Sequence, residues 1–89
     1  MSDADIARLI MSYNIIVREL PLPGARGSVS KKNNSYIILI SPDQPRGQQR
    51  KTLLHELLHI KLEHLDRRKD LPEWLKELEV NQALKELGI

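Results

Sequence analysis

The sequence predicts a single small α+β domain over residues 1–89: an N-terminal helix, a small three-stranded, mostly antiparallel sheet, a central helix and a C-terminal helix. Two observations predict this class. Apolar residues recur every three or four positions in three segments, which is the spacing of helices that bury one face. Between the first two segments lie short β-branched runs separated by prolines, glycines and asparagines, a pattern typical of strands and turns.

The first helix is expected over residues 3–13. Ser2 or Asp3 can cap its N-terminus, and acidic side chains in the first turn interact favourably with the helix dipole. Asn14 is expected to end the helix. The apolar residues at helical spacing are Ile6, Leu9, Ile10 and Tyr13.

Three strands are expected next, over residues 15–20, 27–30 and 36–40, because these runs are rich in residues that favour strands. Residues 31–35 are polar and turn-forming, so we expect the last two strands to form an antiparallel hairpin. Residues 41–45 contain two prolines and break the chain before the next helix.

The central helix is expected over residues 45–65, with Asp43 as its cap and Pro45 in its first turn. Its apolar side chains cover most of the circumference, so the helix should lie in the middle of the domain. These side chains are Leu53, Leu54, Leu57, Leu58, Ile60, Leu62 and Leu65.

The last helix is expected over residues 72–87. Asp70 and Glu73 have the spacing of a capping box, and Pro72 suits a first helical turn. Gly88 is expected to end this helix, because glycine readily adopts the left-handed conformation found after many helices.

Composition and charge argue against several classes of protein. The formal net charge is only +2 and the basic clusters at residues 46–51 and 67–69 are short, so no nucleic-acid partner is expected. Without cysteine there is no disulfide and no thiolate metal site. No signal-peptide pattern is visible, and the longest apolar run, residues 37–40, is too short to span a bilayer. We therefore expect a cytoplasmic protein without a membrane partner.

The most informative pattern is His55-Glu56-Leu57-Leu58-His59 within the central helix. Two histidines four residues apart project from the same face of a helix, so their imidazoles can hold one zinc ion. The glutamate that follows the first histidine is placed to act on a water bound to that ion. The pattern predicts a zinc site with Glu56 as the catalytic group.

Such a site needs a third protein ligand and an open position for water. His64 lies five residues after His59, which turns it about 140° away on a continuous helix. We therefore expect His64 to be a partly buried or surface histidine outside the site.

Glu77 on the last helix is the expected third ligand. It falls within an apolar sector of that helix, where an unpaired carboxylate would be costly, whereas Glu79 points the other way. Pairing with a lysine or arginine is the alternative explanation of Glu77. Asn81 lies one turn further on the same face and is expected to orient a ligand by a hydrogen bond. The apolar sector comprises Trp74, Val80, Leu84 and Leu87.

The run from Thr52 to His59, followed by His64 and by Glu77-Leu78-Glu79-Val80-Asn81, resembles the ImmA/IrrE-type zinc metallopeptidases. The resemblance covers residues 36–87 well and implies a zincin-like, gluzincin-like peptidase core. It implies one bound zinc ion with His55, His59 and Glu77 as ligands and Glu56 as the acid/base. It also implies a protein or peptide substrate, such as a transcriptional repressor encoded on a mobile element.

Two other interpretations compete with an active peptidase. The HExxH pattern could be accidental, although a carboxylate on the later apolar face argues against coincidence. The zinc could also be purely structural, in a module that binds a protein partner as a regulatory or toxin–antitoxin component. Leu58 favours this second interpretation because the family usually has glycine there, whereas Glu56 argues against it. If the domain is a peptidase, an extended substrate is expected to add to a sheet edge, for example the strand at residues 36–40, and Tyr36, Tyr13 or a nearby arginine could stabilise the oxyanion.

Overall fold

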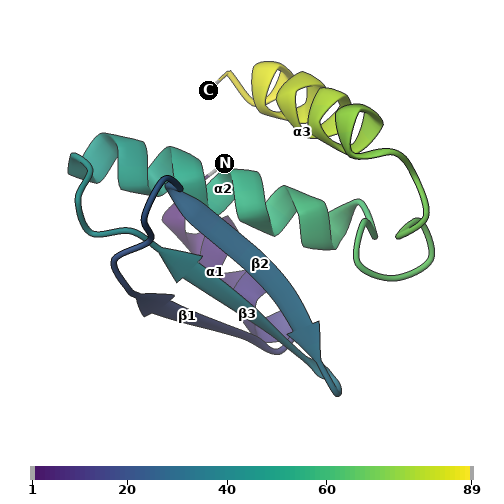
Figure 1. Ribbon diagram of the computed structural model, residues 1–89, viewed down its shortest axis with the longest axis horizontal. Helices are drawn as coiled ribbons and strands as arrows, with labels where there is room; N and C mark the ends of the chain where they lie inside the picture. Colours follow the sequence, from purple (N-terminus) through teal and green to yellow (C-terminus); the bar gives the residue numbers. More distant parts are fainter. Residues whose placement is uncertain (1, 89) are drawn as a thin grey trace.

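The computed structural model describes residues 2–88, which form three helices and a three-stranded sheet, the predicted α+β class (Figure 1). The elements follow one another as α1 (Asp3–Ser12), β1 (Ile15–Glu19), β2 (Gly27–Lys32), β3 (Ser35–Ile40), α2 (Arg46–Lys61) and α3 (Glu73–Glu86). No helix in this part of the chain is long and apolar enough to cross a membrane.

The strands are ordered β1-β3-β2, with β3 in the centre. The predicted antiparallel hairpin of β2 and β3 is confirmed, but its strands are longer than expected, so the turn shrinks to Asn33 and Asn34. Asn33 has a φ of 58°, a left-handed conformation that asparagine tolerates well. The pairing of β1 with β3 is parallel, so only one of the two strand pairings is antiparallel.

The hydrophobic core lies between one face of the sheet and the helices α1 and α2. On β3, Tyr36, Ile38 and Ile40 are buried and alternate with half-buried residues, as expected for a strand with one covered face. They pack in one cluster with Ile6 of α1, Ile15 of β1, and Leu54, Leu57 and Ile60 of α2. Helix α3 packs on α2, on the side of α2 away from the sheet (Figure 1).

Helix α1 begins as predicted. The Ser2 side chain accepts a hydrogen bond from the backbone of Asp5, and the Asp5 carboxylate accepts one from the backbone of Ser2, forming a capping box. The helix ends at Ser12, and Asn14 follows with a φ of 56°. The position of Asn14 is consistent with its expected role in ending the helix.

The predicted caps of the other two helices are wrong. Pro45 rather than Asp43 occupies the N-cap of α2, and Pro72 occupies the N-cap of α3, in both cases without a side-chain cap. Proline suits these positions because its missing N–H is no loss at the start of a helix. Consequently neither Asp43 nor a box of Asp70 and Glu73 caps a helix. Gly88, with a φ of 76°, follows α3 as predicted.

Helix α2 ends at Lys61, four residues before the predicted end at residue 65. Leu62 is its C-cap, and Glu63 adopts the left-handed conformation with a φ of 62°. The N–H of His64 donates to the carbonyl of His59 at 2.9 Å, and the N–H of Glu63 donates to the carbonyl of Ile60 at 3.0 Å. These two bonds define a Schellman motif, which turns the chain back on the helix.

The apolar sector predicted on α3 is only partly covered. Val80 is fully buried and Leu84 packs against the core, but Trp74 is 67% exposed and Leu87 is 37% exposed. Helix α3 packs only on α2 among the described elements. One side of α3 is therefore covered, and the edges of its apolar sector face solvent.

Candidate metal centre

The structure brings together the three predicted ligand residues, two from α2 and one from α3. The Nε2 of His55 lies 3.0 Å from one carboxylate oxygen of Glu77, and the Nε2 of His59 lies 3.1 Å from the other. The three ligand atoms all lie within 4.8 Å of one another. The side chains of His55 and His59 on α2 and of Glu77 on α3 therefore converge on one point.

The chemistry and spacing of this group fit a metal ion. Two imidazole nitrogens and one carboxylate oxygen are a donor set that zinc commonly takes. Tetrahedral ligands about 2.0–2.2 Å from zinc lie roughly 3.4 Å from one another. The N–O distances of 3.0 and 3.1 Å are close to that spacing, so small shifts would admit an ion.

Glu77 is more exposed than the helical wheel suggested, because 44% of its side-chain surface is accessible. The cost of burying a carboxylate is therefore smaller than expected, and the convergence with the two histidines is the stronger reason to single out Glu77. His59 is the most enclosed of the three, with 9% of its side chain exposed, and His55 has 27% exposed.

Glu56 is buried, with 8% of its surface exposed, between the two histidines in sequence. Burial, together with the nearby charge of Glu77, raises its pKa to about 7. Among residues 2–88 the Glu56 carboxylate makes no hydrogen bond or ion pair, yet neither of its oxygens is fully enclosed. The carboxylate is thus available to a molecule that enters the site.

Two cavities meet at Glu56. One, of about 370 Å³, includes His55 and Thr52, and the other, of about 290 Å³, includes His59 and Glu77. Gly27 at the start of β2 lines both cavities, as Glu56 does. Both cavities therefore border Glu56 and the start of the same strand.

Gly27 is needed where β2 approaches α2. A Cβ atom added at Gly27 would lie 2.5 Å from Cγ2 of Thr52 and 3.2 Å from the carbonyl oxygen of Leu39. The side chain of Gln44 stabilises the chain next to Gly27, because it donates hydrogen bonds to the carbonyls of Arg26 and Ser41 at 2.9 and 2.8 Å. Glycine therefore lets the edge of the sheet lie directly against the helix that carries Glu56.

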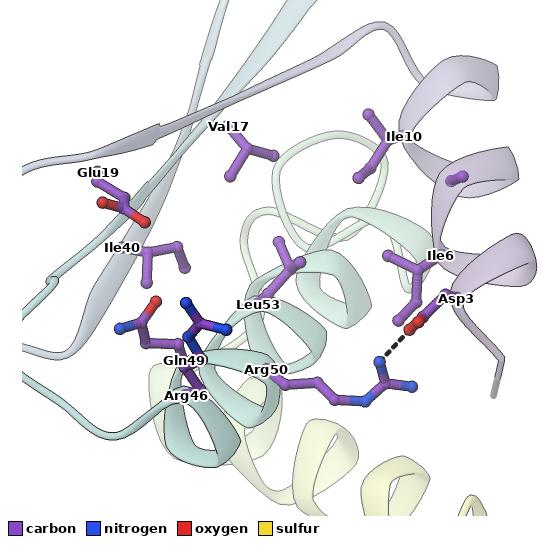
Figure 2. A pocket seen from close by; sticks show the side chains of 11 residues that line it. Asp3, Ile6, Ile10, Val17, Glu19, Ile40, Arg46, Gln49, Arg50 and Leu53 are labelled. Carbon is purple, nitrogen blue, oxygen red and sulfur yellow. Dashed lines mark hydrogen bonds and ion pairs between the residues drawn. The ribbon is translucent and has the colours of Figure 1, made fainter.

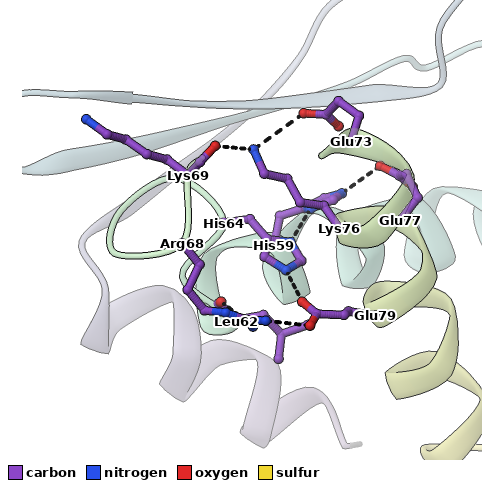
Figure 3. A network of polar contacts seen from close by, with 9 residues as sticks. All are labelled: His59, Leu62, His64, Arg68, Lys69, Glu73, Lys76, Glu77 and Glu79. Carbon is purple, nitrogen blue, oxygen red and sulfur yellow. Dashed lines mark hydrogen bonds and ion pairs between the residues drawn. The ribbon is translucent and has the colours of Figure 1, made fainter. Parts of the chain in front are cut away.

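His64 is where the sequence-based interpretation fails. It is not one of the three clustered ligands, as predicted, but it does not face elsewhere: it is 3% exposed and its Nδ1 lies 2.9 Å from Nδ1 of His59. On its other side Nε2 lies 2.7 Å from Glu79, which also pairs with Arg68 (Figure 3). Hydrogen bonds from Arg68 and His64 lower the pKa of Glu79. The failure follows from Glu63, whose left-handed conformation ends α2 early without the glycine that would have indicated it.

The segment that carries His64 is also attached to the sheet. Asp66 accepts hydrogen bonds from Lys31 of β2 and from the hydroxyl of Tyr36 of β3. These bonds lower the pKa of Asp66. The Tyr36 hydroxyl is thus already engaged by Asp66, and neither Tyr36 nor Tyr13 lines either cavity at Glu56. Arg26 lines the cavity that includes His55 but not the one that includes His59.

Asn81, which was expected to orient a ligand by a hydrogen bond, lies within α3. Its side chain is exposed, and among residues 2–88 it makes no hydrogen bond. The side chain that contacts a candidate ligand from behind is His64 instead. No pattern in the sequence distinguished these two residues, because the contact depends on how α2 ends.

A further cavity, of about 570 Å³, lies between α1, β1 and the first turns of α2 (Figure 2). It contains none of the candidate site residues. Asp3 and Arg50, two of the residues that line it, form an ion pair. The cavity is otherwise lined by Ile6, Ala7, Ile10, Val17, Glu19, Ile40, Arg46, Gln49 and Leu53.

Two histidines and a glutamate on one helix, completed by a carboxylate from the next helix, define a metallopeptidase-like domain. The chain belongs to the Peptidase_M78 family, described as the IrrE N-terminal-like domain, whose family model matches residues 10–83. This match confirms the predicted resemblance. None of the curated proteins and none of the solved structures compared with the chain matches it significantly.

Proposed function

We propose that this domain is a zinc-dependent endopeptidase that hydrolyses peptide bonds. The observation that carries the proposal is the placement of Glu56: a buried carboxylate, free of protein partners among the described residues, next in sequence to a convergent ligand and in the lining of two cavities. Membership of a peptidase family supports it. His55, His59 and Glu77 are proposed as the ligands.

A zinc ion at this position would polarise the scissile carbonyl and lower the pKa of a water molecule beside it. Glu56 would accept the proton of the attacking water and then donate it to the leaving amine. The pKa of about 7 suits both roles, because a group that titrates near neutrality can accept and release a proton.

Strand β2 is the proposed docking edge for an extended substrate. The suggestion that residues 36–40 offer this edge is wrong, because β3 is paired on both sides. The N–H of Ser41 donates to the carbonyl of Arg26. Along an antiparallel pair, every second residue directs its backbone N–H and C=O groups to the partner strand and the residues between direct theirs away from it. Gly27 and Val29 therefore direct their backbone groups to the free edge of β2. Both residues line the cavity that contains His59 and Glu77.

We further propose a regulatory protein as the substrate, such as a transcriptional repressor encoded on a mobile element. Support for this comes from the resemblance to the ImmA/IrrE-type peptidases. A cytoplasmic location accompanies the proposal and is supported by the lack of cysteine.

A structural zinc site without catalysis explains Glu56 less well. A buried carboxylate next to Glu77 costs folding free energy, and a structural site gains nothing from it. In a peptidase the same cost is offset by function.

The test is cleavage of fluorescently labelled casein by zinc-loaded wild type and by Glu56→Gln, with the zinc content of both verified. We expect the Gln variant to lose activity about 100- to 10,000-fold, because the proton acceptor is removed while the ligands stay. Glu19→Gln, an exposed glutamate away from the site, is the matched control and should cleave like wild type. Equal rates for wild type and Glu56→Gln would refute the mechanism.

A further inference from the structure

His64 contacts a proposed metal ligand from the side opposite the metal position. The Nε2 of His59 faces Glu77 at 3.1 Å, whereas its Nδ1 faces Nδ1 of His64 at 2.9 Å (Figure 3). Only 1% of the His64 side chain is exposed. This histidine therefore lies almost entirely within the protein, on the side of the His59 ring away from Glu77, although it also contributes to the lining of the cavity that contains His59 and Glu77.

The end of α2 places the two histidines in contact. In the Schellman motif formed by Glu63 and His64, the residue two positions past the C-cap packs against the residue three positions before it. These positions are His64 and His59 here, so the contact usually made by two apolar side chains is made by two imidazoles. The backbone bond between them, at 2.9 Å, fixes the spacing independently of the side chains.

His64 is held on its far side as well. Its Nε2 lies 2.7 Å from Glu79, and the second carboxylate oxygen of Glu79 pairs with Arg68. Arg68 also donates to the carbonyl of Leu62 at 3.4 Å. The contacts thus run from α3 through the interhelical loop to His59, and the loop itself is fastened to the sheet through Asp66.

The donors and acceptors fit one arrangement when both imidazoles are neutral. A carboxylate only accepts, so His64 donates from Nε2 to Glu79. Nδ1 of His64 then carries a lone pair, and the hydrogen of the 2.9 Å contact belongs to Nδ1 of His59. His59 consequently presents the lone pair of Nε2 toward His55 and Glu77, as a metal ligand must.

We propose that His64 is a positioning residue of the metal centre: it accepts a hydrogen bond from His59, is itself held by Glu79, and so fixes the His59 ring with Nε2 directed at the metal. The proposal rests on the proposed zinc site but not on peptidase activity. It assigns to His64 and Glu79 the role that was expected of Asn81.

The experiment compares zinc affinity, measured by competition with a chromophoric chelator, and the free energy of unfolding of the metal-free protein in urea. Three substitutions at one position separate the two hydrogen bonds. In His64→Asn the Oδ1 atom can replace Nδ1 as the acceptor for His59, whereas in His64→Gln the Nε2 atom can replace the donor to Glu79 only. His64→Leu removes both bonds.

We expect His64→Leu and His64→Gln to bind zinc about 10- to 100-fold more weakly than wild type, as is typical when the partner of a ligating histidine is lost. His64→Asn should stay close to wild type, because it keeps the acceptor. The control Arg67→Ala changes an exposed residue of the same loop and should leave zinc affinity unchanged.

Equal zinc affinity in wild type and all three folded variants would overturn the proposal. The proposal would also be overturned if His64→Asn and His64→Gln both lost zinc affinity in proportion to their loss of unfolding free energy without metal. That result would mean that His64 only stabilises the fold. If His64→Leu does not fold, the comparison of zinc affinity between His64→Asn and His64→Gln is sufficient to test the proposal. A wild type that binds no zinc would overturn the proposed function together with this inference.

Discussion

Glu56 and His59 show how burial prepares the site at the scale of single residues. Burial raises the pKa of Glu56 to about 7, and burial also lowers the pKa of His59 against the opposing effect of Glu77. In both cases the charged form is the one disfavoured. Neutral imidazole is the form that binds a metal, so the enclosure of His59 favours the state that the proposed site requires.

The raised pKa of Glu56 predicts how the metal-free protein responds to pH. Between about pH 4.5 and 7 the folded protein keeps a proton on Glu56 that the unfolded chain releases, so this residue lowers stability as pH rises through that window. In the presence of a chelator, Glu56→Gln should gain stability over wild type across this range, on the order of 2–3 kcal/mol by pH 8. Urea unfolding at several pH values measures it, and a constant difference between the two proteins would contradict the assignment.

Single residues were predictable where regular helical geometry holds. His55, Glu56 and His59 lie within α2, and Glu77 lies within α3, so the helical wheel gave their relative directions. His64 was not predictable in this way, because its position depends on the left-handed Glu63, and glutamate does not indicate that conformation. A glycine at that position would have shown that the helix ends there.

At the scale of elements, the site depends on the contact between β2 and α2. Residues 52–60 of α2 are buried almost without interruption, as its apolar circumference predicted. The hairpin was predictable because its strands are adjacent in sequence and separated by turn residues. The parallel pairing of β1 with β3 was not, because no local pattern encodes which distant strand will be a neighbour.

Gly27→Ala tests that contact. The new methyl group would meet the side chain of Thr52 and the backbone of β3, so β2 must move away from α2. We expect a loss of about 1–3 kcal/mol in the free energy of unfolding, the usual cost of overpacking. Gly47→Ala is the matched control: apart from its chain neighbours and the backbone of its own helix, no atom of the described residues lies within 4 Å of the added Cβ, and alanine in a helix should stabilise the protein by about 0.5–1 kcal/mol. Urea unfolding that shows no difference between the two variants would be inconsistent with a tight contact at Gly27.

At the scale of the whole molecule, α2 is the central element, because it packs against α1, α3, β2 and β3. Helix α3 packs on α2 and buries only Val80 completely among its described residues. An ion shared by His55, His59 and Glu77 would therefore fasten α3 to the rest of a small domain. In a chain of 89 residues such a link should contribute noticeably to stability.

The measurement that tests the central claim most directly is a zinc titration of metal-free wild type and Glu77→Gln, with Glu86→Gln as the exposed control on the same helix. The wild type and the control should bind one zinc ion per chain, and their unfolding temperature should rise with zinc concentration. Glu77→Gln should bind roughly 100-fold more weakly or worse, because it loses one of three ligands. A wild type that binds no zinc, or a Glu77→Gln variant with wild-type affinity, would contradict the assignment of this metal centre.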